Sequence, residues 1–323
     1  MQTSLNSARV AFLGPLGTFT YEAALAHFGS GVEVVAAPSI PAVVDSVARG
    51  DADRGVVPIE NSIEGGVNFT QDTLLDTSLS LCGEIMVDVE QCLLSNAADL
   101  ARIERIYSHP QGLAQCRRWL QRNLPNATLV PTASTVQAAH LVAGDATAGA
   151  VASRLAARLA GVAVVECAIQ DHEPNVTRFV VLGAEPHTTR PTCDDKTSLV
   201  FSTRHERGAL VRALTIFDRA GINLCRIQSR PRSGEAWQYV FFVDLEGHLE
   251  DDNVREALRA LEDVVRKLES GEVPLDDSIS LYERGEALRK HCQARLDAAQ
   301  ARIDKIVAGP DGKASAAVPF DAG

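Results

Sequence analysis

A short run near the middle of the chain combines the side chains needed to bind an anion and deliver a proton. Asn175, Thr177, Arg178 and Phe179 fall in the run NVTRF, which leads directly into the apolar residues 180–183. A hydroxyl, a fixed cation and an aromatic ring at the start of a buried strand suit a small anionic substrate that needs a proton and a charge clamp. The alternative is an ordinary strand start whose arginine pairs with a neighbouring acid.

Four further stretches place glycine and polar residues at the ends of predicted strands. They are GPLGTFTYEAA at 14–24, VPIENS at 57–62, SHPQGLAQC at 108–116, and Ser134-Thr135 followed by two alanines. Together with NVTRF, in this order and spacing, they resemble prephenate dehydratase over roughly residues 8 to 183. Five motifs in order are a specific signal, whereas one alone is weak.

The resemblance implies an enzyme that converts prephenate to phenylpyruvate in phenylalanine biosynthesis, with loss of carbon dioxide and water. Formation of the aromatic ring drives that reaction, so the protein has only to hold two carboxylates and help a hydroxide leave. The sequence carries no metal, nicotinamide or pyridoxal signature, and we expect no cofactor.

Four residues are the predicted catalytic set. Thr177 is the family's candidate for hydrogen bonding to the leaving hydroxyl, and because a threonine hydroxyl is a very weak acid, it has to relay a proton from a stronger one. Glu60 and His109 are the titratable candidates, although His109 equally suits a cap on the helix after Pro110. Arg178 is the predicted carboxylate clamp.

The predicted substrate-binding residues come from the same motifs. The loop at 14–20 is a strand-to-helix turn whose backbone N–H groups suit an anion, with a plain turn as the alternative. Ser134 fits a helix N-cap as well as a carboxylate ligand. The set consists of Thr18, Asn61, Ser62, Ser108, Ser134, Thr135, Asn175 and Phe179.

Composition narrows the class of protein. The chain has 323 residues, 46% hydrophobic and 5% aromatic, which is enough for two or more cores built from small aliphatic side chains. A net charge of −11 argues against general nucleic-acid binding. Seven scattered cysteines without a C-x-x-C pair indicate buried, reduced thiols. We find no signal peptide and no apolar run of membrane-spanning length, so we expect a cytoplasmic protein.

The first part of the chain predicts an α/β fold. Short apolar runs alternate with amphipathic stretches, which favours a mostly parallel sheet covered on both faces. Ser39, Ser134 and Ser153 fit helix N-caps. Residues 81–94 fit a strand that crosses between two lobes, as in the bilobal, periplasmic-binding-protein-like architecture that the resemblance implies. The predicted strands cover residues 10–13, 32–36, 55–59, 103–107, 148–152, 162–166 and 179–182.

A second domain follows a Pro-, Thr- and Asp-rich linker at 184–196. Residues 197–256 show a β-α-β-β-α order that resembles a ferredoxin-like ACT domain without its last strand. The resemblance implies phenylalanine as an effector, although Gln228 stands where the family usually has Glu. The effector-binding candidates are Gly208, Ala209, Leu210, Asn223, Ser229 and Arg230.

The C-terminal part resembles the small subunit of exodeoxyribonuclease VII. Apolar residues at helical spacing form one stripe from Ala257 to Leu268 and a second from Leu281 to Ile306, which predicts a helical hairpin over residues 257–307. The hairpin is expected either to bind a partner, such as the large nuclease subunit, or to pack on its own chain. Residues 308–323 are predicted to be disordered.

The sequence supports three hypotheses about the function. The leading one is a prephenate dehydratase, residues 1–183, with prephenate as substrate and assembly as a homo-oligomer. The alternatives are a bilobal ligand-binding protein without catalysis and a nuclease accessory subunit. Prephenate turnover distinguishes the first from the second, and co-purification with the large nuclease subunit identifies the third.

Overall fold

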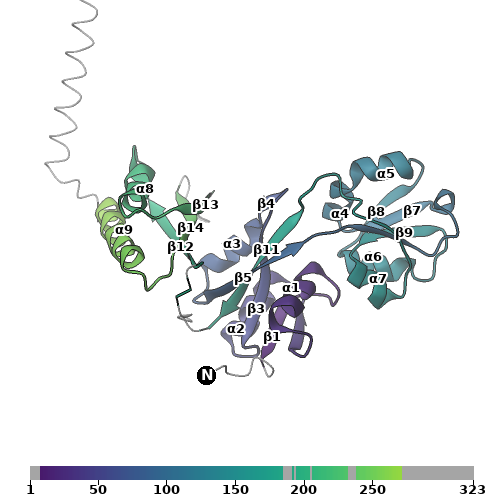
Figure 1. The fold of residues 1–323 in the computed structure, drawn as a ribbon, viewed down its shortest axis with the longest axis horizontal. Coiled ribbons are helices and arrows are strands. Elements are labelled where there is room, and N and C mark those ends of the chain that lie inside the picture. The colour runs from purple at the N-terminus through teal and green to yellow at the C-terminus, as the bar shows by residue number, and fades with distance from the viewer. Residues whose placement is uncertain (1–7, 185–190, 193, 204–205, 232–237, 271–323) are drawn as a thin grey trace, which may run out of the picture. The chain divides into compact units, whose positions relative to one another are not determined.

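The computed structural model describes residues 8–184, 191–192, 194–203, 206–231 and 238–270. The chain divides into two compact units, Met1–Pro191 and Thr192–Gly323. The first unit contains two sheets, each the centre of one lobe, and the second contains a third sheet (Figure 1).

The first lobe is a sheet with helices on both faces. The strand order is β2-β1-β3-β11-β5, with β4 paired to β3. One apolar cluster joins the sheet to α1, and the other joins its opposite face to α2 and α3. The strands are β1 (Arg9–Leu13), β2 (Glu33–Ala37), β3 (Arg54–Asn61), β4 (Gly65–Gly66), β5 (Ser80–Asp88) and β11 (Val176–Gly183), and the helices are α1 (Phe19–Phe28), α2 (Ile40–Ala48) and α3 (Asn68–Leu75).

The second lobe repeats this layering around the order β10-β6-β9-β7-β8. Helices α6 and α7 cover one face and α5 covers the other. The strands are β6 (Cys92–Ser95), β7 (Arg105–Ser108), β8 (Thr128–Pro131), β9 (Ala148–Ala152) and β10 (Val164–Cys167), and the helices are α4 (Pro110–Gln115), α5 (Arg117–Asn123), α6 (Thr135–Val142) and α7 (Arg154–Ala160), with a 3-10 turn at Leu100–Arg102.

Two segments connect the lobes, and we call them the crossing segments. Residues 89–91 join β5 to β6, and residues 168–175 join β10 to β11. The predicted crossing at 81–94 is therefore confirmed, as two strands with a break rather than as one. In Figure 1, β5 and β11 lie side by side in the first lobe, where they are antiparallel neighbours.

The sheet of each lobe is mixed, so the prediction of a mostly parallel sheet is wrong. In the first lobe β1 pairs parallel with β2 and β3, but β11 runs antiparallel to β3 and β5. The second lobe likewise combines parallel and antiparallel pairs. The reason is the crossing, because β11 returns from the second lobe in the opposite direction to β3.

The predicted helix caps are confirmed. The hydroxyls of Ser39, Ser134 and Ser153 accept hydrogen bonds from backbone N–H groups three residues further on. Each satisfies a donor that the first helical turn leaves without an internal partner.

The second unit is a three-stranded antiparallel sheet in the order β12-β14-β13 with two helices. The β-α-β-β-α order is as predicted, and no fourth strand occurs among the residues the structure describes here. The apolar side of α9, including Ala257 and Leu261, packs into the core of this unit. The elements are β12 (Lys196–Thr203), α8 (Ala209–Arg219), β13 (Leu224–Pro231), β14 (Tyr239–Glu246) and α9 (Asp252–Ser270).

Helix α9 contains most of the first helix of the predicted hairpin, so the structure tests that part of the prediction. It continues without a break through residue 257, where the hairpin was predicted to begin. Its apolar residues Ala257, Leu258, Leu261 and Val265 pack on its own chain, which is one of the two alternatives drawn from the sequence. The second helix of the hairpin and the tail at 308–323 lie outside the described residues.

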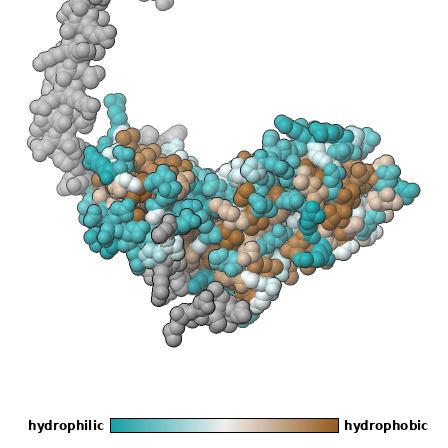
Figure 2. All heavy atoms as spheres, viewed as in Figure 1, coloured by the Kyte–Doolittle hydropathy of each residue, from teal (hydrophilic) through white to brown (hydrophobic). Residues whose placement is uncertain are grey.

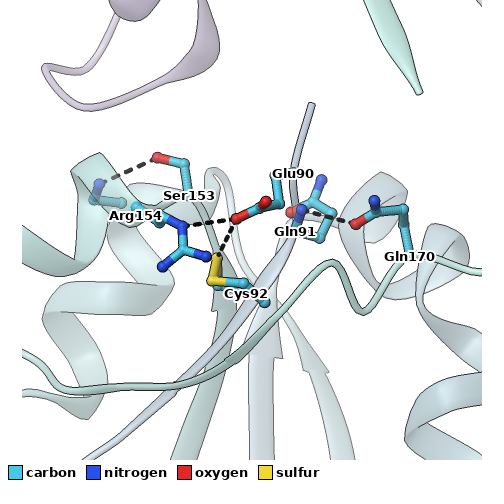
Figure 3. The surroundings of a disulfide bond; sticks show 8 residues. Glu90, Gln91, Cys92, Ser153, Arg154 and Gln170 are labelled. Atoms are coloured by element: carbon cyan, nitrogen blue, oxygen red, sulfur yellow. Dashed lines mark hydrogen bonds and ion pairs between the residues drawn. A yellow bond between two sulfur atoms is a disulfide. The ribbon is translucent and has the colours of Figure 1, made fainter. Parts of the chain in front are cut away.

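One expectation about the cysteines is wrong. Cys92 and Cys167 form a disulfide between adjacent strands β6 and β10, with Cα atoms 4.0 Å apart. In the described part of the chain, Cys82, Cys116 and Cys225 form no disulfide. Figure 3 shows the disulfide beside the first crossing segment, with Glu90 and Gln91 immediately before Cys92. Composition alone did not reveal it, because the two residues are 75 positions apart.

The surface carries both polar and apolar residues. Figure 2 shows hydrophilic residues interspersed with apolar ones on the face drawn. Among the described helices, none has the length and apolar character required to cross a membrane.

Candidate functional site

Thr177 lies at the start of β11, between Asn61 of β3 and Val87 of β5. Its Oγ1 accepts a hydrogen bond of 2.9 Å from Asn61 Nδ2. Within the described residues this is the one hydrogen bond that reaches the Thr177 hydroxyl. Because an oxygen lone pair takes the Asn61 proton, the hydroxyl's own proton is left to donate to another group.

The orientation of the Asn61 amide is fixed by the backbone. Its Oδ1 accepts from the N–H groups of Ile63 and Glu64, at 3.0 and 3.1 Å. Its Nδ2 therefore faces the other way, toward Thr177 and Asn175 Oδ1, which is 2.9 Å away. Asn61 is 4% exposed, so water does not compete for these bonds.

Hydrogen bonds between side-chain amides extend from Asn61 into the second lobe. Asn175 Nδ2 donates to Gln115 Oε1 at 3.1 Å. Gln115, at the end of α4 in the second lobe, donates from Nε2 to Glu64 Oε1 of the first lobe at 3.0 Å. Gln91 in the first crossing segment donates to the same Gln115 Oε1 at 3.2 Å. We call Asn61, Asn175, Gln115 and Gln91 the amide chain.

Two members of the amide chain were not predicted as site residues. Gln115 was visible only as part of the motif at 108–116. Gln91 had a usable signal, since it is a polar residue within an apolar run, and such a residue, when buried, needs a partner. The partner itself, 24 positions away, is not readable from the sequence.

Thr177 and Arg178 lie on opposite faces of the sheet, so the expectation of a hydroxyl and a cation side by side is wrong. Phe179 packs on the α1 face and Val180 on the α2 face. Because side chains alternate along a strand, Thr177 shares the first face and Arg178 the second.

Arg178 is held by two carboxylates, the alternative recognised from the sequence. Its Nε donates to Glu84 Oε2 at 2.7 Å, and its Nη1 lies 3.7 Å from Glu60 Oε2. The Arg178 side chain is 10% exposed. It therefore joins β3, β11 and β5 on the face away from Thr177, and Glu60 lies on that face with it.

The predicted residues of the second lobe serve local structure. His109 caps α4 through its Nδ1, which accepts from the Gln111 N–H at 3.3 Å. Ser134 caps α6, and Thr135 is the first residue of that helix. Ser108 is fully buried, and its hydroxyl donates to the Val151 carbonyl at 2.6 Å.

The hydroxyls of Ser62 and Thr18 in the first lobe also form hydrogen bonds with backbone groups. The Ser62 hydroxyl donates to the Pro174 carbonyl and accepts from the Val176 N–H, which fastens the second crossing segment to the end of β3. Thr18 caps α1 and donates to the carbonyls of Leu13 and Pro15. Its position therefore depends on the 14–18 loop.

The 14–18 loop brings the two lobes together. Gly17 has φ +93°, and a Cβ there would lie 2.9 Å from Leu159 and 3.4 Å from Val136 of the second lobe. The Ser153 hydroxyl donates to the Gly17 carbonyl at 3.5 Å. The positive φ favours glycine here, and a larger residue would also displace the Leu159 side chain.

A cavity of about 530 Å³ lies between α1, the first crossing segment and α7. Asp88 in its wall is paired with Val176, the residue before Thr177. Burial raises the pKa of the Glu22 carboxyl, while a hydrogen bond from Ser153 and the charge of Arg158 lower it. The lining residues are Phe19, Glu22, Asp88, Glu90, Ser153, Arg154, Leu155 and Arg158.

Neither a thiol nucleophile nor a metal cluster is evident near the amide chain in the described residues. Cys116 follows Gln115, but burial, together with the charge of Asp171, raises the pKa of its thiol to about 12. A thiol with that pKa stays protonated and is a poor nucleophile. Glu90, Cys92 and Cys167 are grouped closely enough to hold a metal, but their two sulfurs are joined.

The predicted effector residues lie in the second unit. Gly208, with φ +80°, precedes α8, and the Asn223 amide donates to Glu246 Oε1 at 2.8 Å. Gln228, which stands in place of the family's Glu, accepts from Arg226 Nη2 at 2.6 Å. The other predicted effector residues are Ala209 and Leu210 at the start of α8, and Ser229 and Arg230 on β13.

Three family models match the chain in succession. Prephenate dehydratase matches residues 10–187, the ACT domain 197–263, and the exonuclease VII small subunit 255–305. The last two overlap within α9.

Known proteins match about four fifths of the chain. A bifunctional chorismate mutase/prephenate dehydratase from Aquifex aeolicus is 44% identical over 79% of this chain and 70% of its own length. The structure of a prephenate dehydratase from Arthrobacter aurescens in complex with L-Phe aligns with TM-score 0.75 at 33% identity, over 80% of this chain and 87% of that one. GqqA, described as a novel type of quorum quenching acylase, aligns with TM-score 0.71 at 30% identity, over 79% and 93%.

Proposed function

The chain belongs to the prephenate dehydratase family, and we propose that the Thr177 hydroxyl and the amide chain behind it form its reaction centre. The reaction is the conversion of prephenate to phenylpyruvate, with loss of carbon dioxide and water, in phenylalanine biosynthesis. The observation that carries the proposal is the hydrogen bond from Asn61 to Thr177.

Thr177 acts on the leaving hydroxyl. Since its oxygen accepts from Asn61, its proton is free to hydrogen-bond to the prephenate hydroxyl as the carbon–oxygen bond breaks. Asn61 holds the threonine in that orientation before substrate arrives, so no reorganisation is needed at the moment of reaction. A threonine hydroxyl is too weak an acid to supply a full proton, so Thr177 stabilises developing charge and relays a proton.

The stronger acid comes from another residue. Glu60 pairs with Arg178 on the opposite face of the sheet, so it is the less suitable of the two predicted proton sources. His109 can supply a proton only as an imidazolium, and a protonated Nδ1 cannot accept the Gln111 N–H that caps α4, so this role requires the cap to open. Glu22 is a third source, since its carboxyl lines the cavity and holds its proton to higher pH than an ordinary glutamate does.

The substrate carboxylates need cations, and Arg178 is engaged with acids away from Thr177. Arg154 and Arg158 line the cavity instead, on the side of the second lobe. We assign them the carboxylate-binding role expected of Arg178. Arg154 already pairs with Glu90 at 2.7 Å, so substrate binding exchanges one carboxylate partner for another.

Product analysis tests the proposal. The purified full chain should convert prephenate to phenylpyruvate with stoichiometric carbon dioxide, and it should lack acylase activity, the chemistry named for the second aligned structure. Acylase activity without prephenate turnover would contradict the assignment.

Regulation by phenylalanine follows from the ACT match and from the L-Phe bound in the Arthrobacter protein. We expect weak binding here, because the family's carboxylate is Gln228 and its amide oxygen is taken by Arg226. Calorimetry on the full chain measures this directly. A micromolar affinity would contradict the expectation.

A second role is favoured by the exonuclease VII small-subunit match at 255–305. We propose that this segment binds the large nuclease subunit through residues other than those of α9 that pack on the sheet of the second unit. A pull-down with the large subunit should retain the full chain and lose a variant that lacks residues 271–323. Equal retention of both would count against it.

Homo-oligomer formation and a cytoplasmic location, both expected from the sequence, stay predictions. Light scattering on the eluted protein measures the first. Cell fractionation measures the second, and the Cys92–Cys167 disulfide makes that measurement worth doing, since such bonds are rare in a reducing compartment.

A further inference from the structure

Gln91 occupies an unusual position between the two crossing segments. Its backbone N–H donates to Gln170 Oε1 at 3.1 Å, and its carbonyl accepts from the Ile169 N–H at 3.0 Å. Figure 3 shows Gln91 and Gln170 facing each other, with Cys92 following directly. The peptide of Gln91 is thus locked to the second crossing segment where the chain enters the second lobe.

The side chain of Gln91 is buried and only half satisfied. It is 3% exposed, and its Nε2 donates to Gln115 Oε1 at 3.2 Å. Its Oε1 is buried without a partner among the described residues. An aliphatic side chain would fill this space without stranding an oxygen, so packing does not account for a glutamine here.

The contact with Gln115 has a directional consequence. Gln115 Oε1 receives two N–H donors, from Gln91 and from Asn175. Two donors on one oxygen fix which way the Gln115 amide faces, and this turns its Nε2 toward Glu64 of the first lobe. The Asn175 amide is fixed in turn, so its Oδ1 is left to accept from Asn61, which holds Thr177.

We propose that Gln91 is a positioning residue of the dehydratase, which orients the Gln115 amide and through it the Asn175 amide, whose Oδ1 accepts from the same Asn61 Nδ2 that holds Thr177. This rests on the proposed reaction centre. Gln91 does not contact the substrate, so its loss should lower the rate of the chemical step rather than weaken substrate binding.

Three variants of the full chain test the role. Gln91→Met keeps the volume and removes the donor, and it should lower kcat by roughly 10-fold while KM changes by less than about 2-fold. Gln170→Met is the matched control, because Gln170 holds the Gln91 backbone but is not bonded to Gln115. It should retain kcat within about 2-fold of the unmodified chain.

Gln91→Glu supplies a signature that a packing role cannot produce. Its carboxylate opposes Gln115 Oε1 at high pH, whereas its protonated form donates to that oxygen at low pH. Relative to the unmodified chain, the kcat of this variant should rise as pH falls from about 8 to about 5.5. Folding of each variant is checked by its thermal unfolding midpoint.

The outcomes are separable. A kcat of Gln91→Met near that of the unmodified chain, an equal loss in Gln170→Met, or a flat relative pH profile of Gln91→Glu would overturn the positioning role. In each case the unmodified chain still turns prephenate over, so the proposed function stands. Absence of turnover by the unmodified chain would contradict the proposed function and this inference with it.

Discussion

At the scale of single residues, the site depends on which face of a strand each side chain occupies. Thr177 and Arg178 are neighbours in sequence, yet one joins the amide chain and the other joins two acids on the opposite face. Their chemistry therefore cannot be shared, because the sheet separates them. This changes what a substitution at Arg178 should do.

Arg178→Lys should lower stability and leave substrate binding unchanged. The carboxylate clamp predicted from the sequence would imply a raised KM, but Arg178 pairs with Glu84 and Glu60 instead, and a lysine lacks the planar fork to span both. We expect a loss of about 1–3 kcal/mol in the free energy of unfolding, measured with urea. Arg9→Lys, in the exposed pair with Glu33, is the control and should cost little. A raised KM for prephenate with unchanged stability would instead support the role of Arg178 in binding a substrate carboxylate.

Glu22→Gln should change how stability depends on pH. The pKa of Glu22 is raised in the folded chain, so its contribution is favourable below the unfolded pKa and is lost as pH rises through the folded pKa. Glutamine cannot ionise, so the unfolding midpoint of the variant relative to the unmodified chain should increase between about pH 4.5 and pH 8. A difference that is constant with pH would show that Glu22 titrates normally.

At the scale of elements, local patterns predicted the fold well and the contacts between distant segments poorly. Strand β9 matches its predicted bounds, and the three serine caps are confirmed, because apolar runs and capping residues act within a few positions. Asn61, Asn175 and Thr177 were predicted as site residues. Their mutual bonds were not, since these join positions 114 and 116 apart and depend on how β11 returns against β3.

The Cys92–Cys167 disulfide joins β6 to β10 where both crossing segments reach the second lobe. Closing a loop between residues 75 apart restricts the unfolded chain, which typically stabilises the fold by about 2–4 kcal/mol. Cys167→Ala should lower the urea midpoint accordingly, and a reductant should do the same to the unmodified chain. Cys82→Ala is the matched control. Insensitivity to the reductant would indicate that the two thiols are not joined in solution.

Leu261→Asp should unfold the second unit. Leu261 is 5% exposed in its core, on the side of α9 for which the sequence left open a partner interface or packing on its own chain. A buried charge there should cost about 3 kcal/mol or more. Loss of the cooperative unfolding transition of that unit is the expected result, and Glu262→Lys, on the exposed side, should leave it intact. A folded variant that fails only to bind the nuclease large subunit would favour the partner interface instead.

At the scale of the whole molecule, three family segments share one chain and two of them share a helix. The ACT match ends at residue 263 and the nuclease-subunit match begins at 255, both within α9. Ala257 and Leu261 therefore lie in both matched segments, and both pack in the core of the second unit. The proposed reaction centre does not include this junction, because the amide chain and Thr177 belong wholly to the first unit.

The first unit is proposed to dehydrate prephenate through the Thr177 hydroxyl. The direct measurement is the steady-state rate of phenylpyruvate formation by the full chain and by its Thr177→Ala and Thr177→Ser variants. We expect turnover by the unmodified chain, a kcat lower by ~10²–10⁴-fold for Thr177→Ala with its fold intact, and partial activity for Thr177→Ser. A Thr177→Ala variant with unchanged kcat would contradict the proposal.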